Sequence, residues 1–313
     1  MPDRLYYKTS LGQCVCGDSL DILSEQPDNS IDLIVTSPPF ALQRKKEYGN
    51  EDQTEYVDWF LTFGKMAYPK LKETGSFVVD LGGAYQKGTP IRSLYQYRLL
   101  IRMCDELGYM LAEEFFWHNS SKLPSPIEYV NKRKIRAKDS VNTNWWFVKS
   151  PNAKADVRNV LVEYSDRMRK LLASNGTYYK AQERPSGHQM SDRFNKDNGG
   201  AIPSNLLQIP NSESNSKYLR YCKALGIKGH PARFPAGLPQ FYIKMLTEPG
   251  DLVVDIFAGA NTTGMVAEEL GRRWLSIELR QDYVASSVLR FAGTEEQARE
   301  YYSQLMEGQS LTL

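Results

Sequence analysis

Short apolar runs alternate along this chain with stretches whose apolar residues recur at helical spacing. Seven runs rich in β-branched and aromatic residues are predicted strands, at residues 13–17, 31–36, 76–81, 113–117, 144–148, 252–255 and 273–278. Residues 55–66 and 91–107 predict amphipathic helices, and Gly108 closes the second. Strands that alternate with helices predict an α/β fold with one sizeable sheet that is mostly parallel.

This alternation fails between residues 150 and 229. The segment is rich in Asn, Ser, Gly, Lys and Arg, as in RPSGHQMSDRFNKDNGG. We interpret it as an inserted recognition region, so the predicted organisation is a first catalytic part at 1–149, the insertion at 150–229 and a second catalytic part at 230–313.

Composition narrows the class of protein. A chain of 313 residues with 41% hydrophobic and 12% aromatic content can bury a full core. No run approaches the roughly 18 apolar residues that span a bilayer, and MPDRLYYKTS lacks the apolar stretch of a signal peptide, so we expect a cytoplasmic protein without a membrane partner. The four cysteines and three histidines are scattered, which argues against a disulfide framework or a metal site.

Residues 251–279, DLVVDIFAGANTTGMVAEELGRRWLSIEL, predict a strand, a tight turn, a helix and a second strand, which is the arrangement of a nucleotide site. Gly259 allows close approach of the backbone to a ligand, and the helix after Asn261 presents free N–H groups. The candidate cofactor-binding residues here are Asp255 for an ammonium group, Phe257 for packing, Glu278 for two ribose hydroxyls, and the turn residues Ala258, Gly259, Asn261 and Thr262.

The same devices occur in nicotinamide-binding folds, which leaves an oxidoreductase as one alternative. The glycine fingerprint of that class, GxGxxG, is absent, because Asn261 stands where its second glycine would lie. The segment therefore favours a methyltransferase over a dehydrogenase.

Residues 31–40, IDLIVTSPPF, predict a strand followed by Ser37, Pro38, Pro39 and Phe40. Consecutive prolines impose a rigid, extended turn. The amino group of an aromatic base is a poor nucleophile, since its lone pair is conjugated into the ring. Ser37 Oγ and the Pro38 carbonyl can accept its hydrogens, while the Phe40 ring can stack on a flipped base and stabilise a cationic nitrogen. These four residues are the candidate catalytic residues.

Together, TSPPF and DIFAGANTTG resemble the motifs of the amino-methyltransferases of DNA restriction-modification systems, in the permuted order called the beta class. The resemblance is strongest to the PvuII-type, cytosine-N4-specific branch and extends through LPSPIEYVNKRKIRAKD, NLLQIPNSESN and HPARFPA. It implies a methyltransferase fold, in which a mostly parallel seven-stranded sheet carries helices on both faces. It also implies S-adenosylmethionine as cofactor, double-stranded DNA as partner, and HPARFPAGLP in the cofactor pocket. It also implies a cognate restriction nuclease, although not a bound one.

Asp18, Ser37, Asp255 and Glu278 each follow a predicted strand, so we expect them to gather at the carboxyl edge of one sheet, where ligands bind in open α/β folds. By resemblance, Asp18 is a partner for the adenine amino group or a neighbouring hydroxyl of the cofactor. Its alternative role is that of an ordinary helix cap.

The target base follows partly from the residues. Methylation of a cytosine carbon needs a thiolate, commonly after proline, and no cysteine here follows proline. Ser37 resembles the cytosine-N4 pattern, with adenine-N6 as the alternative, and the PvuII-type resemblance implies the inner cytosine of CAGCTG. A DNA-binding protein that has lost catalysis is another alternative.

Contacts with DNA have to come from local clusters of charge, because the net charge is only +2. Two clusters are candidates for phosphate contacts: Arg44, Lys45 and Lys46, and then Lys132, Arg133, Lys134, Arg136 and Lys138. In the predicted insertion, the candidates for reading base edges are Arg184, His188, Arg193 and Asn195.

Overall fold

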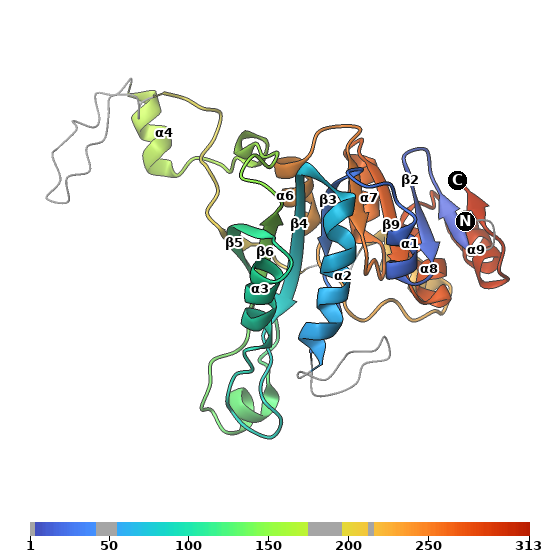
Figure 1. Ribbon diagram of the computed structural model, residues 1–313, viewed down its shortest axis with the longest axis horizontal. Helices are drawn as coiled ribbons and strands as arrows, with labels where there is room; N and C mark the ends of the chain where they lie inside the picture. The colour runs from blue at the N-terminus through green and yellow to red at the C-terminus, as the bar shows by residue number, and fades with distance from the viewer. Residues whose placement is uncertain (1–3, 42–54, 175–195, 212–215) are drawn as a thin grey trace, which may run out of the picture. The chain divides into compact units, whose positions relative to one another are not determined.

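A computed structural model of the chain describes residues 4–41, 55–174, 196–211 and 216–313 (Figure 1). All seven predicted strands are present in one sheet. They are β2 (Gly12–Cys16), β3 (Ile31–Thr36), β4 (Leu71–Gly82), β5 (Met110–His118), β6 (Val141–Val148), β8 (Leu252–Asp255) and β9 (Arg273–Glu278). These strands are contiguous in the order β2-β9-β8-β3-β4-β6-β5. The α/β fold is therefore confirmed.

The strand count and the directions of some strands differ from the prediction. Within the described residues the sheet has ten strands, because β1 (Tyr6–Lys8) and β10 (Leu311–Thr312) extend one side and β7 (Leu206–Gln208) extends the other. Strands of two or three residues are too short to have a recognisable hydrophobic period. From β2 to β4 all ladders are parallel. The sheet is nevertheless mixed, because β6 runs antiparallel to β4 and β5, and β1 runs antiparallel to β2.

Helices lie on both faces of the sheet, as predicted. On one face are α1 (Ser19–Ser24), α2 (Tyr56–Lys70) and α3 (Tyr95–Asp105). On the other are α6 (Gly237–Leu246), α7 (Thr262–Glu269) and α8 (Gln281–Ser287) (Figure 1). The helix predicted from residue 91 begins only at Tyr95, because residues 83–94 form a loop with a bridge between Tyr85 and Arg92.

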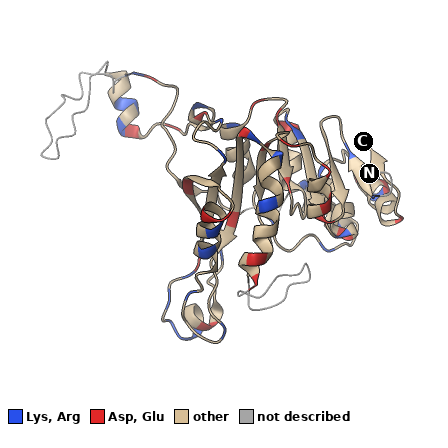
Figure 2. Ribbon diagram, viewed as in Figure 1, with Lys and Arg blue, Asp and Glu red and all other residues tan. Residues whose placement is uncertain are grey.

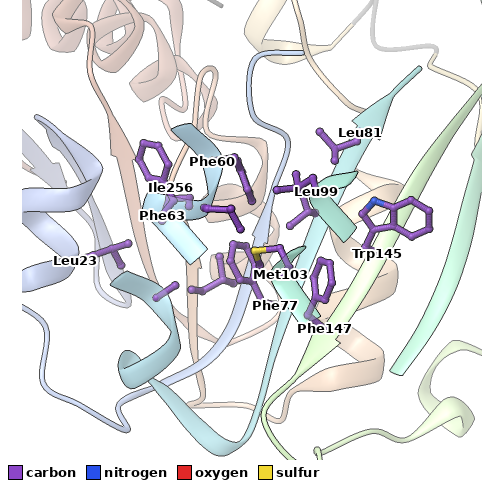
Figure 3. Packing of buried hydrophobic residues seen from close by; sticks show 14 of the residues in the cluster. Leu23, Phe60, Phe63, Phe77, Leu81, Leu99, Met103, Trp145, Phe147 and Ile256 are labelled. Atoms are coloured by element: carbon purple, nitrogen blue, oxygen red, sulfur yellow. The ribbon is translucent and has the colours of Figure 1, made fainter. Parts of the chain in front are cut away.

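The core between the sheet and α1 to α3 follows the two-residue period of the strands. Phe77, Val79 and Leu81 of β4 and Trp145 and Phe147 of β6 point into it. They pack with side chains from the helices, including Leu23, Phe60, Phe63, Leu99 and Met103 (Figure 3). Residues that alternate with these, such as Asp80 and Asn144, therefore belong to the opposite face of the sheet.

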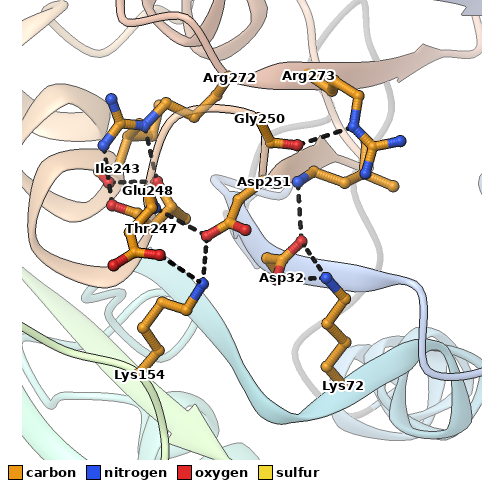
Figure 4. Close-up of polar contacts among 11 residues, drawn as sticks. Asp32, Lys72, Lys154, Ile243, Thr247, Glu248, Gly250, Asp251, Arg272 and Arg273 are labelled. Atoms are coloured by element: carbon orange, nitrogen blue, oxygen red, sulfur yellow. Dashed lines mark hydrogen bonds and ion pairs between the residues drawn. The ribbon is translucent and has the colours of Figure 1, made fainter.

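Charged side chains tie together the edge of the sheet where β3 and β8 begin (Figure 4). Buried Asp32 accepts from the Leu252 backbone N–H at 2.9 Å and pairs with Lys72 at 2.7 Å, and Lys154 pairs with Asp251 at 2.7 Å. Pairing compensates for the desolvation of the Asp32 carboxylate. These contacts hold the two central strands in register at the end remote from their carboxyl termini.

Two compact units divide the chain: residues 1–155 with 205–313, and residues 156–204. The second unit contains the short 3₁₀ helix η2 (Val157–Val160) and α4 (Asp166–Ala173), and its bridge between Val162 and Ala201 closes a loop. The predicted recognition region, 150–229, overlaps this unit, and its role remains a prediction. The first unit also contains α5 (Lys217–Ala224), η5 (Val288–Arg290) and α9 (Glu295–Met306). None of the described helices is long and apolar enough to cross a membrane.

Candidate active site

A cavity of about 530 Å³ lies at the carboxyl edge of the parallel strands. Residues that follow β2, β3, β8 and β9 line it together, as the strand order requires. Ten of the twelve predicted site residues line this cavity: Asp18, Ser37, Pro38, Pro39, Phe40, Phe257, Ala258, Gly259, Thr262 and Glu278. Asp255 and Asn261 do not line it.

Ser37 is held by a buried polar network on the sheet. Its Oγ donates to Asp80 Oδ2 at 2.9 Å. Asp80 also accepts from Asn144 Nδ2 at 2.6 Å and from Asn142 Nδ2 at 3.2 Å. Tyr242 of α6 in turn donates to Asn144 Oδ1 at 3.0 Å. With its proton directed toward Asp80, Ser37 Oγ offers lone pairs to other donors in the cavity.

Asp80 is 5% exposed, and burial raises the pKa of its carboxyl group to about 6. Hydrogen bonds from Ser37, Asn142 and Asn144 act in the opposite direction, as does the charge of Lys122. Desolvation dominates, because the charged form loses hydration that four partners only partly replace. Asp80 is therefore charged at neutral pH but close enough to titration to bind a proton in mildly acidic solution.

The Phe40 ring packs against the backbone of Gly82 at the end of β4. A methyl group at Gly82 would lie only 2.5 Å from the Phe40 ring, so only glycine allows this approach. Tyr95 of α3 donates a hydrogen bond to the Gly82 carbonyl. Phe40 is half-buried and lines the cavity, so part of the ring is available for stacking.

On the side formed by β8 and β9, Glu278 is bound to the turn that follows β8. Its Oε2 accepts from the Gly259 N–H at 2.9 Å, and its Oε1 accepts from the Arg280 N–H at 2.9 Å. A carboxylate has about four acceptor positions, so positions remain for a ligand with two hydroxyls. Burial raises the pKa of Glu278, while the two backbone N–H groups lower it.

Gly259 has φ +52°, a backbone conformation that favours glycine. A side chain there would meet the His230 ring at 3.1 Å. His230 lines the cavity with Pro231, Ala232, Arg233 and Phe234, which is where the HPARFPAGLP segment was expected. Burial lowers the pKa of His230 to about 4, so its imidazole is neutral at physiological pH.

Phe257 belongs to an aromatic cluster that forms one wall of the cavity. Its ring centroid lies 4.9 Å from that of Phe63 and 5.6 Å from that of Trp59, and both α2 side chains also line the cavity. Such packing provides a rigid apolar surface for a planar or aliphatic ligand group.

Asp255 lies behind the wall of the cavity, with 1% of its surface exposed. Its two oxygens accept from Thr36 Oγ1 at 2.7 Å and Thr263 Oγ1 at 2.6 Å, and Oδ1 also accepts from the Phe257 N–H at 3.1 Å. Burial raises its pKa. The carboxylate thus joins the ends of β3 and β8 to α7, and direct contact with a ligand would require these bonds to rearrange.

Asn261 is fully buried and caps α7 from a left-handed conformation, with φ 51°. Its Oδ1 accepts from the Gly264 N–H at 3.0 Å and from Ser276 Oγ at 2.6 Å, and its Nδ2 donates to Tyr7 Oη at 2.8 Å. Asparagine tolerates this conformation better than most residues. The side chain secures the turn that carries Gly259.

Asp18 combines the two roles weighed from the sequence. Its carboxylate caps α1 by accepting from the Leu20 N–H at 2.7 Å, and it also lines the cavity. The neighbouring Ser19 donates to the Ile256 carbonyl at 2.6 Å, which fixes α1 against the turn that follows β8.

The second basic cluster lies in the loop that joins β5 to β6, at residues 119–140 (Figure 2). This loop leaves the sheet at the edge that carries the cavity. It contains the short π-helix η1 (Glu128–Lys132), and the loop residues Asn119 and Lys122 line the cavity. Arg44, Lys45 and Lys46, and the candidate base-reading residues Arg184, His188, Arg193 and Asn195, lie outside the described residues.

Several residues of the site were not predicted. Asp80 is a polar residue near the end of the predicted strand 76–81, just as Ser37 follows the end of the predicted strand 31–36. Its position in the sequence could therefore have identified it as a site residue. Asn142, Asn144, Trp59 and Phe63 carry no such signal, because strand pairing and helix packing bring them there. Within the described residues, no group of three or more His, Cys, Asp or Glu side chains is arranged for a metal ion.

Residues 31–289 match the model of the DNA methylase family. Among curated relatives, the type II methyltransferase M.PvuII of Proteus hauseri is 60% identical over 98% of this chain and 92% of its own length. The type II methyltransferase M.ScaI of Streptomyces caespitosus is 26% identical over 91% of this chain and 83% of its own.

Among solved structures, the cytosine-N4-specific PvuII DNA methyltransferase superposes with a TM-score of 0.81 at 53% identity, over 99% of this chain and 98% of its own. A modification methylase of Thermus thermophilus in complex with S-adenosyl-L-methionine superposes with a TM-score of 0.53 at 18% identity, over 98% of both chains, and shares the fold.

Proposed function

This chain belongs to the DNA methylase family, and we propose that it transfers a methyl group from S-adenosylmethionine to the exocyclic N4 of cytosine in double-stranded DNA. The observation that carries this proposal is the joint presence of Ser37 and Glu278 in one cavity. Ser37 offers acceptor lone pairs for an amino group, and Glu278 offers acceptors for a diol. A transferase needs both kinds of binding group within reach of each other.

The cavity residues fit S-adenosylmethionine. The volume of about 530 Å³ lies within the range of small-molecule sites. Glu278 would hold the ribose hydroxyls, the Phe257 wall would pack against the ligand, and Gly259 gives the backbone close access. When bound, this cofactor supplies an electrophilic methyl group on a sulfonium ion.

The network around Ser37 would activate the amino nitrogen of the base. Ser37 Oγ and the Pro38 carbonyl accept its hydrogens, which orients the nitrogen lone pair away from the ring. As the nitrogen becomes positive, the Asp80 carboxylate stabilises that charge through Ser37, and the proton released from nitrogen passes to Ser37 Oγ as Ser37 gives its own to Asp80 Oδ2. The Phe40 ring stacks on the base.

Cytosine is the proposed base for two reasons. Serine at position 37 follows the cytosine-N4 pattern, and the 60% identical relative M.PvuII has a solved counterpart described as cytosine-N4-specific. By the same similarity, the site is the inner cytosine of CAGCTG, and methylation would protect DNA from a cognate nuclease of a type II system.

The basic β5–β6 loop would bind phosphates at the mouth of the cavity. Lys132, Arg133, Lys134, Arg136 and Lys138 lie in this loop. The unit formed by residues 156–204, within the wider region 150–229, would read base edges. Phosphate contacts set the register of the enzyme on the duplex, while base contacts determine the sequence.

The proposed function is tested by incubating the protein with S-adenosylmethionine and unmethylated DNA and identifying the modified nucleosides by mass spectrometry. We expect N4-methyldeoxycytidine, confined to CAGCTG when the DNA is sequenced at single-molecule level. N6-methyldeoxyadenosine would replace the proposal with the adenine alternative. Binding of cofactor and DNA without any product would instead identify a DNA-binding protein that has lost catalysis.

A further inference from the structure

We propose that Leu123 is the wedge that enters the DNA stack and fills the space left by the extruded cytosine. This inference rests on the proposed function, since it concerns how the base reaches the cavity.

Leu123 directly follows a residue of the cavity wall. Lys122 and Asn119 line the cavity, yet the Leu123 side chain is 80% exposed. Among the large hydrophobic residues described as exposed, none has a larger exposed fraction. An exposed apolar side chain one residue from the wall of a base-binding cavity is positioned to contact the bases on either side of the one that enters.

Hydrogen bonds hold the loop on both sides of Leu123. The exposure of its side chain is therefore not due to an unsupported loop. The Lys122 N–H donates to the Asn119 carbonyl at 3.2 Å, and Lys138 Nζ donates to the Lys122 carbonyl at 3.2 Å. Beyond Leu123, the Asp139 N–H donates to the Ser125 carbonyl at 2.9 Å. Pro124 and Pro126 restrict the backbone on the C-terminal side.

A second loop supports the first from the end of β4. Arg92 binds Asp139 through two hydrogen bonds of 2.7 and 2.9 Å, and Arg136 donates to the Pro90 carbonyl at 2.9 Å. These contacts join residues 83–94 to residues 119–140. A wedge needs such support, because a mobile side chain would be pushed aside by the stack rather than enter it.

The charges on the loop indicate that its binding partner is DNA. Five basic and two acidic residues follow Leu123 in the loop, so this part of the loop carries a net positive charge. Of the acidic residues, Glu128 pairs with Lys132 of the same loop at 3.3 Å, and Asp139 pairs with Arg92 of the neighbouring loop. Cations around an exposed leucine are complementary to a DNA duplex. The phosphates would contact the basic side chains, while the bases would contact Leu123. Leucine is among the side chains that separate base steps in this way.

The physical reason for a wedge is the cost of extrusion. Removing cytosine from the helix breaks its pairing and stacking and leaves an apolar gap one base pair thick. A branched aliphatic side chain in the gap restores part of the lost contact and blocks the return of the base. Leu123 would then raise the population of the extruded state without touching the reacting atoms, as a positioning residue.

The test uses a CAGCTG duplex in which 2-aminopurine replaces the target cytosine, because its fluorescence rises when the base leaves the stack. Wild-type protein should raise the fluorescence, Leu123→Ala should lose most of the rise at saturating protein, and Leu123→Phe should retain it. Ile101→Ala is the matched control, since Ile101 is a large aliphatic residue, 55% exposed, on α3. It should behave as wild type.

Methyl transfer gives the second readout. On a fully paired duplex, Leu123→Ala should slow single-turnover transfer about tenfold or more. On a duplex whose target cytosine lies opposite an abasic site, the rate should return close to the wild-type value, because extrusion is then less costly. A defect of equal size on both duplexes would overturn the inference, as would fluorescence and rates equal to wild type.

Two outcomes separate the inference from the proposed function. If wild type forms N4-methylcytosine and Leu123→Ala matches it, only the wedge fails. If wild type transfers no methyl group and leaves 2-aminopurine stacked, the proposed function fails as well. Leu123→Ala could also have a lower molecular mass in solution than wild type but the same 2-aminopurine fluorescence. This result would assign Leu123 to a contact between protein copies and would contradict the wedge.

Discussion

Ser37 Oγ lies 2.9 Å from Asp80 Oδ2, and this hydrogen bond crosses from the end of β3 to the end of β4. It connects a side chain at the cavity surface to a carboxylate that is almost completely buried. The serine therefore has a defined proton direction, and its lone pairs have a defined target in the cavity.

Ser37→Ala should slow methyl transfer far more than it weakens cofactor binding, because Ser37 orients the amino group and does not hold the cofactor. Loss of one such hydrogen bond costs about 1–3 kcal/mol, or on the order of tenfold to a hundredfold in rate. Single-turnover kinetics and calorimetric titration of cofactor measure the two effects separately. Equal losses of transfer rate and of cofactor affinity would show that Ser37 does not act specifically in the reaction step.

Methyl transfer should decline as the pH falls through about 6, the raised pKa of the Asp80 carboxyl. A protonated Asp80 can donate to Ser37 Oγ and occupy the lone pair intended for the base. In Asp80→Asn the rate should be low at every pH and should lack this acidic limb. His230 cannot produce the limb, since its pKa is lowered to about 4. A limb that persists in Asp80→Asn would contradict this assignment.

Asp80 should also affect the stability of the fold. This contribution should decrease as the pH rises, whereas methyl transfer should increase. Its pKa is higher in the folded chain than the value of about 3.9 in an unfolded one, so the folded state binds more protons between about pH 4 and 6. The contribution of Asp80 to the free energy of unfolding is therefore largest below pH 4 and is lost as the pH rises through 6. Chemical denaturation across this range gives the free energy of unfolding of wild type and of Asp80→Asn at each pH. The contribution of Asp80 is the difference between the two proteins in the slope of this free energy against pH.

Phe40→Ala should reduce transfer more than Ser37→Ala does, because it removes the ring that stacks on the base and stabilises a developing cation. Phe40→Tyr should retain activity, since either ring can stack. Rates of both variants on one duplex, compared under single-turnover conditions, decide the question. Equal activity of Phe40→Ala and wild type would exclude the ring from the site.

Glu278→Ala should weaken S-adenosylmethionine binding by on the order of tenfold to a hundredfold, because the diol acceptor is lost. Glu269→Ala is a suitable control, since Glu269 is an exposed glutamate of α7. Calorimetry measures the affinities, and thermal denaturation verifies that each variant is folded. Unchanged affinity in folded Glu278→Ala would remove this residue from the cofactor site.

Replacing Lys132, Arg133 and Lys134 by alanine should weaken binding to cognate and random DNA alike and should reduce the dependence of affinity on salt. The reason is that phosphates carry little sequence information. Replacing the exposed Lys8, Lys65 and Lys223 by alanine provides a control with the same loss of charge outside the loop. A loss confined to cognate DNA would show that the cluster reads bases instead.

The sequence was most informative where local pattern and chemistry coincide. Apolar runs identified all seven central strands, and the residues after them, such as Ser37 and Glu278, indeed line one cavity. The parallel direction of the strands makes this possible, because it brings their carboxyl ends to the same edge.

The sequence was least informative where a side chain depends on distant partners. Nothing near Asp255 indicates that Thr36 and Thr263 occupy its oxygens, because one of these residues is 219 positions away. Asn142 and Asn144 reach Asp80 only through the pairing of β4 with β6. The exposure of Leu123 likewise depends on two loops that bind each other.

The most direct test of the account is the identity of the atom that receives the methyl group. A CAGCTG duplex with ¹⁵N at the exocyclic amino group of the inner cytosine is incubated with the protein and S-adenosylmethionine labelled with ¹³C in its methyl group. The account predicts a one-bond ¹³C–¹⁵N coupling in the product, which Ser37→Ala should form much more slowly. A methyl group on cytosine carbon or on adenine, or a product that forms equally fast without Ser37, would contradict it.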